Sequence, residues 1–95
     1  RKRAGHMLQI EVEARNLGEV REALECGVNV IMLDNMSLDE MTEACKLVDG
    51  KAKTEASGNV TLDNIRAVAE TGVDIISLGA LTHSVQAFDI SMKWG

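Results

Sequence analysis

The stretch Val28–Asn35, V-N-V-I-M-L-D-N, decides the fold of this chain. It is a short apolar run, rich in β-branched residues, that ends abruptly in the polar residues Asp34 and Asn35. Such a run is typical of a buried strand in a parallel sheet, whose last residue emerges at the carboxyl edge of the sheet. We therefore predict a strand over Val30–Asp34 that places a carboxylate at that edge.

The same pattern occurs a second time, 45 residues later. The sequence G-V-D-I-I-S-L-G at Gly72–Gly79 matches G-V-N-V-I-M-L-D at Gly27–Asp34. Three positions upstream match at the same offset: Leu17, Arg21 and Glu25 with Leu62, Arg66 and Glu70. A helix, a glycine and a strand are thus written twice, and each repeat is long enough for two strand–helix units.

Period-two and helical patterns, together with capping residues, divide the whole chain into alternating strands and helices. The expected elements are a strand over Ile10–Ala14, a helix capped by Asn16 that ends at Gly27, the strand Val30–Asp34, a helix capped by Ser37 that ends near Gly50, a strand over Ala52–Ser57, a helix capped by Thr61 that ends at Gly72, a strand over Ile75–Gly79, and a last helix that opens at Thr82 or Ser84.

Four strand–helix units with short connections predict an α/β fold with a parallel sheet and the helices outside. Four units make half of a TIM-like (incomplete α/β) barrel, and 95 residues are far fewer than the ~250 of a closed one. A flavodoxin-like open sheet is the rival. We disfavour it because Glu11 and Glu13 would carry two same-face carboxylates into a packed interface.

The composition excludes several classes of protein. The formal net charge is −5 and basic residues cluster only at Arg1–Arg3, so no nucleic-acid surface is expected. No apolar stretch reaches the ~18 residues of a membrane span. Cys26 and Cys45 lack metal-ligand spacing, so we expect free thiols in a reducing cytoplasm. The chain starts at Arg1 and not at methionine, which leads us to expect a piece of a longer protein.

Parity along the strands predicts where chemistry could lie. If Ile10, Val12 and Ala14 face the helices, Glu11 and Glu13 face the inside of the barrel. Asp34 faces the inside on the next strand by the same argument. Barrel enzymes place catalytic groups at these carboxyl ends, and two unpaired carboxylates in one cavity need a cation, a metal or substrate hydroxyls. The alternative is a salt bridge to Lys53. We prefer that alternative for Glu11, and the catalytic interpretation for Glu13 and Asp34.

Two glycine-containing segments predict phosphate binding. Ser57-Gly58-Asn59 follows the third strand and Leu78-Gly79-Ala80 follows the fourth. Each glycine lets backbone amides approach an anion, and barrels often bind phosphate at their last two strand ends. His83 could contact the same anion. Alternatively, both glycines are simple turn residues and His83 is a surface residue at the start of a helix.

Four blocks of the sequence carry a resemblance to a known family. They are I-E-V-E at 10–13, I-M-L-D-N-M at 31–36, E-A-S-G-N-V-T-L-D-N-I at 55–65 and D-I-I-S-L-G-A-L-T-H-S at 74–84. They resemble the C-terminal part of quinolinate phosphoribosyltransferases. The resemblance implies a magnesium-dependent enzyme that makes nicotinate mononucleotide, pyrophosphate and carbon dioxide from quinolinate and phosphoribosyl pyrophosphate in NAD biosynthesis. It also implies an N-terminal domain, an incomplete α/β barrel and a homodimer or higher assembly.

The resemblance assigns roles to individual residues. Glu13 and Asp34 resemble the acidic residues near the ribosyl group and its metal, and the two glycine segments resemble the phosphate-binding loops. The family commonly has S-G-G where this chain has Ser57-Gly58-Asn59. Asparagine tolerates left-handed backbone geometry better than most residues, so the loop can keep its shape, although the approach of its backbone to a ligand is altered.

The resemblance further implies that residues 1–95 are the C-terminal part of the barrel domain. The basic residues that hold the two carboxylates of quinolinate would then precede this chain, and the chain alone would be inactive. Two alternatives remain open: a related phosphoribosyltransferase-like protein associated with molybdenum transport, and a phosphate-binding or purely structural half-barrel module. A half-barrel also has two open sheet edges, so we expect self-association through a twofold axis.

Overall fold

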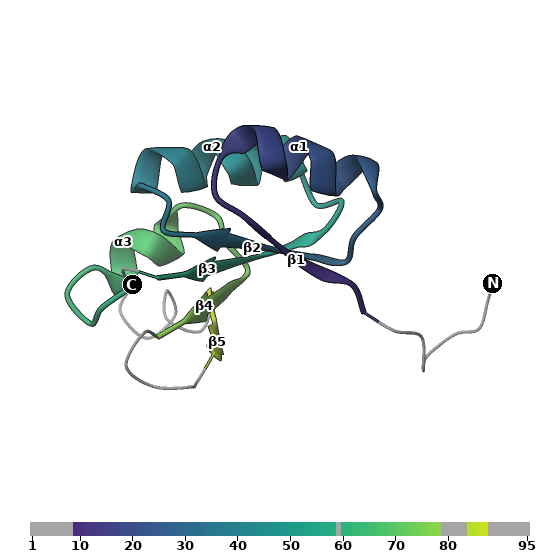
Figure 1. Cartoon of the computed structure of the whole chain (residues 1–95). Coiled ribbons are helices and arrows are strands. Elements are labelled where there is room, and N and C mark those ends of the chain that lie inside the picture. The colour runs from purple at the N-terminus through teal and green to yellow at the C-terminus, as the bar shows by residue number, and fades with distance from the viewer. Residues whose placement is uncertain (1–8, 59, 79–83, 88–95) are drawn as a thin grey trace.

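The computed structural model describes residues 9–58, 60–78 and 84–87 of the chain. Strands and helices alternate along most of this part (Figure 1). In chain order the elements are β1 (Glu11–Ala14), α1 (Leu17–Glu25), β2 (Val30–Asp34), α2 (Leu38–Val48), β3 (Lys53–Ser57), α3 (Ile65–Glu70), β4 (Ile75–Ser77) and β5 (Ser84–Gln86).

The strands form one sheet in the order β1-β2-β3-β4-β5. β1 to β4 are mutually parallel, and β5 pairs antiparallel with β4. α1 and α2 lie side by side over one face of the sheet (Figure 1). The predicted α/β architecture with a parallel sheet is therefore confirmed, and the predicted bounds of the second strand agree with the structure.

The first two helices begin where their capping residues predict. Asn16 Oδ1 accepts a hydrogen bond from Glu19 N at 2.9 Å, and Glu19 Oε1 accepts one from Arg15 N at 2.7 Å. At α2, Ser37 Oγ accepts from Glu40 N at 3.1 Å while Glu40 Oε1 accepts from Ser37 N at 3.2 Å. These bonds satisfy amide groups that a helix start otherwise leaves unpaired.

The core lies between the sheet and the helices and is aliphatic. Its largest fully buried side chains come from both halves of the chain: Ile31, Leu33, Ile76, Val20, Val48 and Val68. Burying one such side chain contributes roughly 1.5–3 kcal/mol. Cys26 is exposed, Cys45 is half-buried, and both are free thiols as predicted. Within the described part of the chain, no helix has the length and apolar character needed to cross a membrane.

The third helix starts later than predicted. Thr61 does not cap it, because α3 begins at Ile65. Instead Thr61 N donates to Asn64 Oδ1 at 2.8 Å, and Asn64 N donates to Thr61 O at 3.2 Å. Asparagine side chains compete for nearby backbone groups in this way, and here the result is a turn in place of the first helical turn.

The prediction of a helix starting at Thr82 or Ser84 is wrong for Ser84, because residues 84–86 form β5. β5 pairs with β4 in the register Ser77↔Ser84. A β4 edge without a neighbour would leave backbone N–H and C=O groups unpaired, and this strand provides partners for them. Local helix-start signals carry no information about that long-range requirement. Thr82 lies outside the described residues.

Candidate functional site

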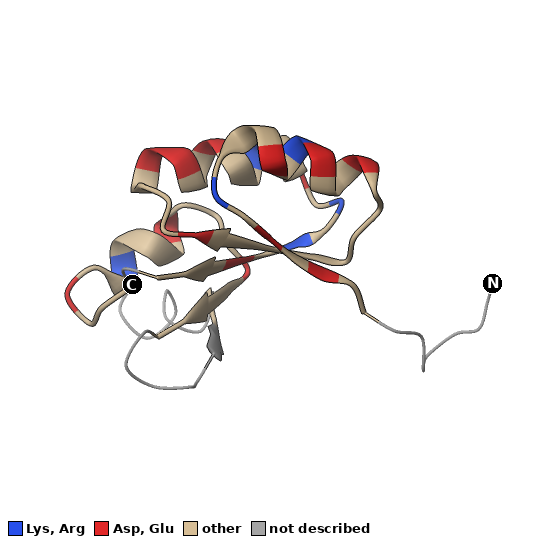
Figure 2. Ribbon diagram, viewed as in Figure 1, with Lys and Arg blue, Asp and Glu red and all other residues tan. Residues whose placement is uncertain are grey.

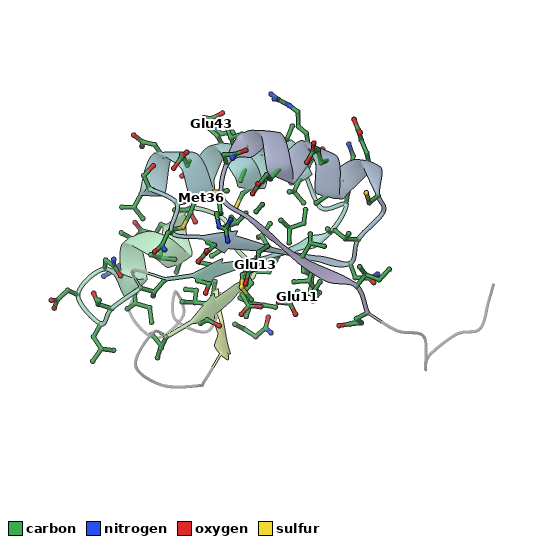
Figure 3. The ribbon with its side chains drawn as sticks, in the orientation of Figure 1. Glu11, Glu13, Met36 and Glu43 are labelled. Atoms are coloured by element: carbon green, nitrogen blue, oxygen red, sulfur yellow. The ribbon has the colours of Figure 1, made fainter. Side chains whose placement is uncertain are left out.

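The predicted acidic residues lie on the face of the sheet that points away from α1 and α2. Val12 and Ala14 are turned toward the core, so Glu11 and Glu13 alternate to the opposite face, where Figure 3 shows them. The register pairs Glu13 with Met32, which has the same parity as Asp34 two residues later. Charged residues also cover the outer sides of α1 and α2, but those positions are remote from this face (Figure 2).

Asp34 forms an ion pair that the sequence analysis missed. Arg15 Nε lies 3.8 Å from Asp34 Oδ2. The Arg15 side chain is 71% exposed and that of Asp34 is 27% exposed, so the pair is open to solvent on one side. Arg15 lies two residues beyond Glu13, and extending the period-two pattern by one step would have placed it on the same face. A cation therefore accompanies one of the two predicted catalytic carboxylates.

The preferred salt bridge between Glu11 and Lys53 is wrong. Among the described residues, no ion pair links Lys53 to Glu11 or Glu13, and the Lys53 side chain is exposed at the start of β3. Glu11 lies instead against Glu55. Partial removal from water raises the pKa of the Glu11 carboxyl group, and the charge of Glu55, a hydrogen bond with Glu55 and the charge of Glu13 raise it further.

Glu55 is the most buried carboxylate on this face, with 8% of its surface exposed. Ser77 Oγ donates a 2.6 Å hydrogen bond to Glu55 Oε2, which joins β3 to β4 through side chains. The sequence analysis placed Glu55 within the predicted strand Ala52–Ser57 but assigned it no role. The alternation of Lys53, Glu55 and Ser57 with the buried Thr54 and Ala56 was the signal that could have placed it on the site face.

The loop after β3 lies directly against the end of β2. Asp34 is paired with Ser57 in the sheet, and Asn35 N donates to Ser57 O at 2.9 Å. Gly58 has φ +74°, and a Cβ atom placed on it would lie 3.3 Å from Asp34 Oδ1. The predicted catalytic carboxylate and the first predicted phosphate-binding loop are therefore in contact.

The second predicted phosphate-binding segment is described only at its first residue. Leu78 is half-buried and follows β4 directly. Asn59, Gly79, Ala80 and His83 lie outside the described residues.

A pocket of about 270 Å³ lies elsewhere, between α1 and the β1 strand. It is lined by both apolar and acidic residues: Val12, Glu13, Glu19, Glu22, Ala23, Cys26 and Val28. It includes Glu13 but no residue of either glycine segment. It therefore does not join the predicted catalytic and phosphate-binding residues.

The sequence is similar to those of proteins in one known family. The family model for the quinolinate phosphoribosyl transferase C-terminal domain matches residues 1–93. The chain belongs to this family. It is 50% identical over 92 residues to a probable carboxylating nicotinate-nucleotide pyrophosphorylase of Bacillus subtilis, which covers 97% of this chain and 32% of that protein. It is 46% identical over 101 residues to the chloroplastic pyrophosphorylase of Oryza sativa subsp. japonica, covering 90% of this chain and 27% of that protein.

Solved structures of the same family agree with the fold. The crystal structure of nicotinate-nucleotide pyrophosphorylase from Ehrlichia chaffeensis matches with a TM-score of 0.76 and 42% identity, over 82% of this chain and 28% of that one. The enzyme from Francisella tularensis matches with a TM-score of 0.71 and 40% identity, over 80% of this chain and 28% of that one. The prediction of part of a TIM-like barrel is confirmed. The chain spans about a third of the length of the curated relatives it matches.

Proposed function

We propose that this chain is the C-terminal part of the barrel domain in a protein that transfers the phosphoribosyl group of phosphoribosyl pyrophosphate to quinolinate. The products are nicotinate mononucleotide, pyrophosphate and carbon dioxide, in NAD biosynthesis. The observation that carries the proposal is the 50% identity to the Bacillus subtilis relative, whose name is probable nicotinate-nucleotide pyrophosphorylase (carboxylating). The contact between Asp34 and the Ser57–Gly58 loop supports it, because a phosphoribosyl group needs a carboxylate beside an anion-binding loop.

The reaction requires stabilisation of positive charge on the ribose. The pyridine nitrogen forms a bond to the anomeric carbon while the bond from that carbon to the pyrophosphate oxygen breaks, and pyrophosphate keeps the electron pair. Positive charge develops on the ribose, where fixed carboxylates at Glu13 and Asp34 stabilise it. The Arg15 guanidinium orients the Asp34 carboxylate. One quinolinate carboxylate then leaves as carbon dioxide, and the ring carbon that retains its electron pair takes up a proton.

The phosphate groups of the substrate fit the ends of β3 and β4. Ser57 supplies a hydroxyl donor, and Gly58 lets backbone amides approach an anion because it has no side chain. Leu78, Gly79, Ala80 and His83 are proposed to complete this phosphate site. α3 begins only at Ile65, so the loop amides rather than the helix start are proposed to bind the anion.

The carboxylates also fit a magnesium ion. Among the described residues there is no group of three or more His, Cys, Asp or Glu side chains that could hold a metal. Magnesium, however, is commonly bound by one or two carboxylates together with waters and substrate phosphates. Glu13 and Asp34 would hold it in that manner. When bound, it would neutralise charge on the pyrophosphate leaving group.

A hybrid protein tests the proposal. This chain would replace the matching 92-residue segment of the Bacillus subtilis relative, and formation of nicotinate mononucleotide would be measured. Glu13→Ala and Asp34→Ala should each lower kcat by roughly 10²–10³-fold, the loss typical of one removed charge-stabilising group. Glu43→Ala is the control, because Glu43 lies on the outer side of α2 (Figure 3) and, among the described residues, forms an ion pair only with Lys46, at 3.7 Å. Near-normal turnover of Glu13→Ala at unchanged melting temperature would refute its assigned role.

The second candidate is a phosphate-binding or structural module, for which the contact between Asp34 and the Ser57–Gly58 loop would serve equally well. Titrating the 95-residue chain with phosphoribosyl pyrophosphate and magnesium separates the two forms of this candidate. Amide shifts confined to Ser57 and Gly58 would indicate binding without the remainder of the enzyme. A hybrid that binds phosphoribosyl pyrophosphate but makes no nicotinate mononucleotide would favour the molybdenum-associated relative.

We also propose that the 95-residue chain self-associates. Of the two open sheet edges expected from the sequence, β5 covers the one at β4, and within the described residues β1 has a single strand neighbour. An uncovered edge favours pairing between copies. Sedimentation of the 95-residue chain at high micromolar concentration should show a dimer, and Ile10→Lys should shift it to monomer because Ile10 is 52% exposed beside that edge. A wild-type monomer under these conditions would contradict the proposal.

A further inference from the structure

Asn35 has an unusual backbone conformation for a residue with a side chain. Its φ is +56°, in the left-handed region, and among described non-glycine residues only Asp49, with φ +49°, shares this feature. Asn35 is exposed, so burial of its side chain does not explain why this conformation is kept. Its N–H continues the β2–β3 hydrogen-bond ladder by one step, donating to Ser57 O at 2.9 Å. The left-handed turn therefore starts where the sheet ends.

The Asn35 side chain packs against the α-carbon of Gly58. A Cβ atom on Gly58 would be 2.5 Å from Asn35 Oδ1 and 2.9 Å from Asn35 Cγ, closer than real side chains approach. Gly58 itself has φ +74°. Two left-handed residues, each directly after the end of one of two neighbouring strands, are thus in contact, and there is no room between them for a side chain on Gly58. The Asn35 amide therefore occupies the space that a side chain on Gly58 would need.

We propose that Asn35 is a positioning residue that determines the distance between the Ser57–Gly58 loop and the Asp34 carboxylate. The inference rests on the proposed function, and it deepens it by assigning a third residue to the contact between the carboxylate and the phosphate loop. Asn35 acts through Gly58 and not through the substrate. The part of the substrate whose placement depends on this contact is the phosphoribosyl group, and quinolinate does not depend on it.

A matched pair of variants tests this role in the hybrid protein. Asn35→Gly keeps the left-handed backbone but removes the amide, and it should raise KM for phosphoribosyl pyrophosphate by about tenfold while KM for quinolinate stays unchanged. Gly58→Ala forces the loop away from Asp34 and should cost about a hundredfold in kcat/KM, the loss expected for a displacement of about 1 Å. Asp49→Gly makes the same backbone change at the end of α2 and should leave both constants unchanged.

The double variant Asn35→Gly/Gly58→Ala gives the decisive outcome. Removing the amide relieves the contacts at 2.5 and 2.9 Å but leaves the contact with Asp34 Oδ1 at 3.3 Å and the left-handed backbone of Gly58, so recovery should be partial. The double variant should still be about tenfold more active than Gly58→Ala alone. A purely structural role would lower the melting temperature without this recovery. If the effects of the two substitutions simply multiply, or if both KM values rise together, the proposed positioning role is wrong.

A measurement without substrate keeps this inference separate from the proposed function. In the 95-residue chain, Asn35→Gly should move the amide resonances of Ser57 and Gly58 and raise the hydrogen exchange of Gly58, while Asp49→Gly should not. If the hybrid makes no nicotinate mononucleotide but these shifts occur, the function is wrong and the coupling between Asn35 and the loop stands. If the resonances do not move, the positioning role fails, whatever the hybrid does.

Discussion

The two halves of the chain carry the same sequence repeat but differ in how their helices begin. In the first half, α1 has nine residues and α2 has eleven, and both are capped by side chains. In the second half, α3 has six residues and its N-cap residue makes no side-chain cap bond. The repeat therefore specifies the order of the elements and not their lengths.

The difference arises at two positions of the repeat. Asn16 and Glu19 correspond to Thr61 and Asn64 in the second half. In the first half both side chains bond to backbone amides. In the second half the backward bond is kept, from Thr61 N to Asn64 Oδ1, but in the described structure the Thr61 side chain makes no capping hydrogen bond to α3. Apolar spacing places a helix, whereas reciprocal capping decides where it begins.

The largest expected difference between the halves concerns their cores. Ile31 and Ile76 occupy the same repeat position and are both 0% exposed. Replacing either by alanine leaves a cavity, which typically costs about 2–5 kcal/mol. We expect Ile31→Ala to cost more, because β2 has parallel neighbours on both sides and lies under the two longer helices. Urea unfolding of both variants measures the difference, and equal costs would show that the halves are equally well packed.

The elements of the first half could be predicted from sequence because the deciding signals are local. Asn16, Ser37 and the period-two strands each act within one turn or one strand. The late start of α3 depends on a competition between two backbone–side-chain bonds at Thr61 and Asn64, which spacing alone does not resolve. β5 depends on the unpaired edge of β4, which exists only after the sheet has formed.

The candidate site was predicted as far as strand parity extends. Glu13, Asp34 and Ser57 could be placed on one face because each lies within or at the end of a strand. Arg15 and the contact of Asn35 with Gly58 were missed, since both lie just beyond strand ends, where backbone direction is set by left-handed residues and turns. The direction of a side chain at these positions follows from tertiary structure and not from the period-two alternation of a strand.

The second prediction concerns hydrogen bonds that tie neighbouring strands together at equivalent positions. Asn29 Oδ1 accepts from Ile10 N at 2.8 Å, and at the same repeat position Asp74 Oδ2 accepts from Thr54 N at 2.9 Å and from Thr54 Oγ1 at 3.3 Å. Asp74→Ala should cost roughly 1.5–3 kcal/mol, because hydrogen bonds to a charged group are lost, and Asn29→Ala roughly 0.5–1.5 kcal/mol. Thermal unfolding compares the two. A larger loss for Asn29→Ala would reverse the expected ranking.

The third prediction addresses the caps directly. Asn16→Ala should destabilise the chain by about 1 kcal/mol because it removes a helix cap. Thr61→Ala, at the equivalent position of the second half, should change stability by less than about 0.5 kcal/mol because its side chain makes no cap bond. Chemical denaturation of both variants gives the comparison. A loss of similar size for Thr61→Ala would mean that α3 extends to Thr61 in solution.

The smallest expected effect depends on pH and links the two halves through Glu11 of β1 and Glu55 of β3. The pKa of Glu11 is raised above its ordinary value of 4.5 by partial removal from water and then by Glu55 and Glu13. A carboxyl group whose pKa is higher in the folded state stabilises the fold below its unfolded pKa, and this stabilisation is lost as pH rises through the folded pKa. Glutamine does not ionise, so the Glu11→Gln variant does not lose stability in this way as pH rises. The free energy of unfolding of the variant should therefore match that of wild type near pH 4. At pH 7 it should be slightly larger, by no more than about 0.5 kcal/mol at such an exposed position. Glu43→Gln, which only removes the surface pair with Lys46, gives the baseline for a lost surface charge. A Glu11→Gln variant that is less stable than wild type at pH 7 would show that the ionised Glu11 is held by a partner that attracts it, and not opposed by Glu55.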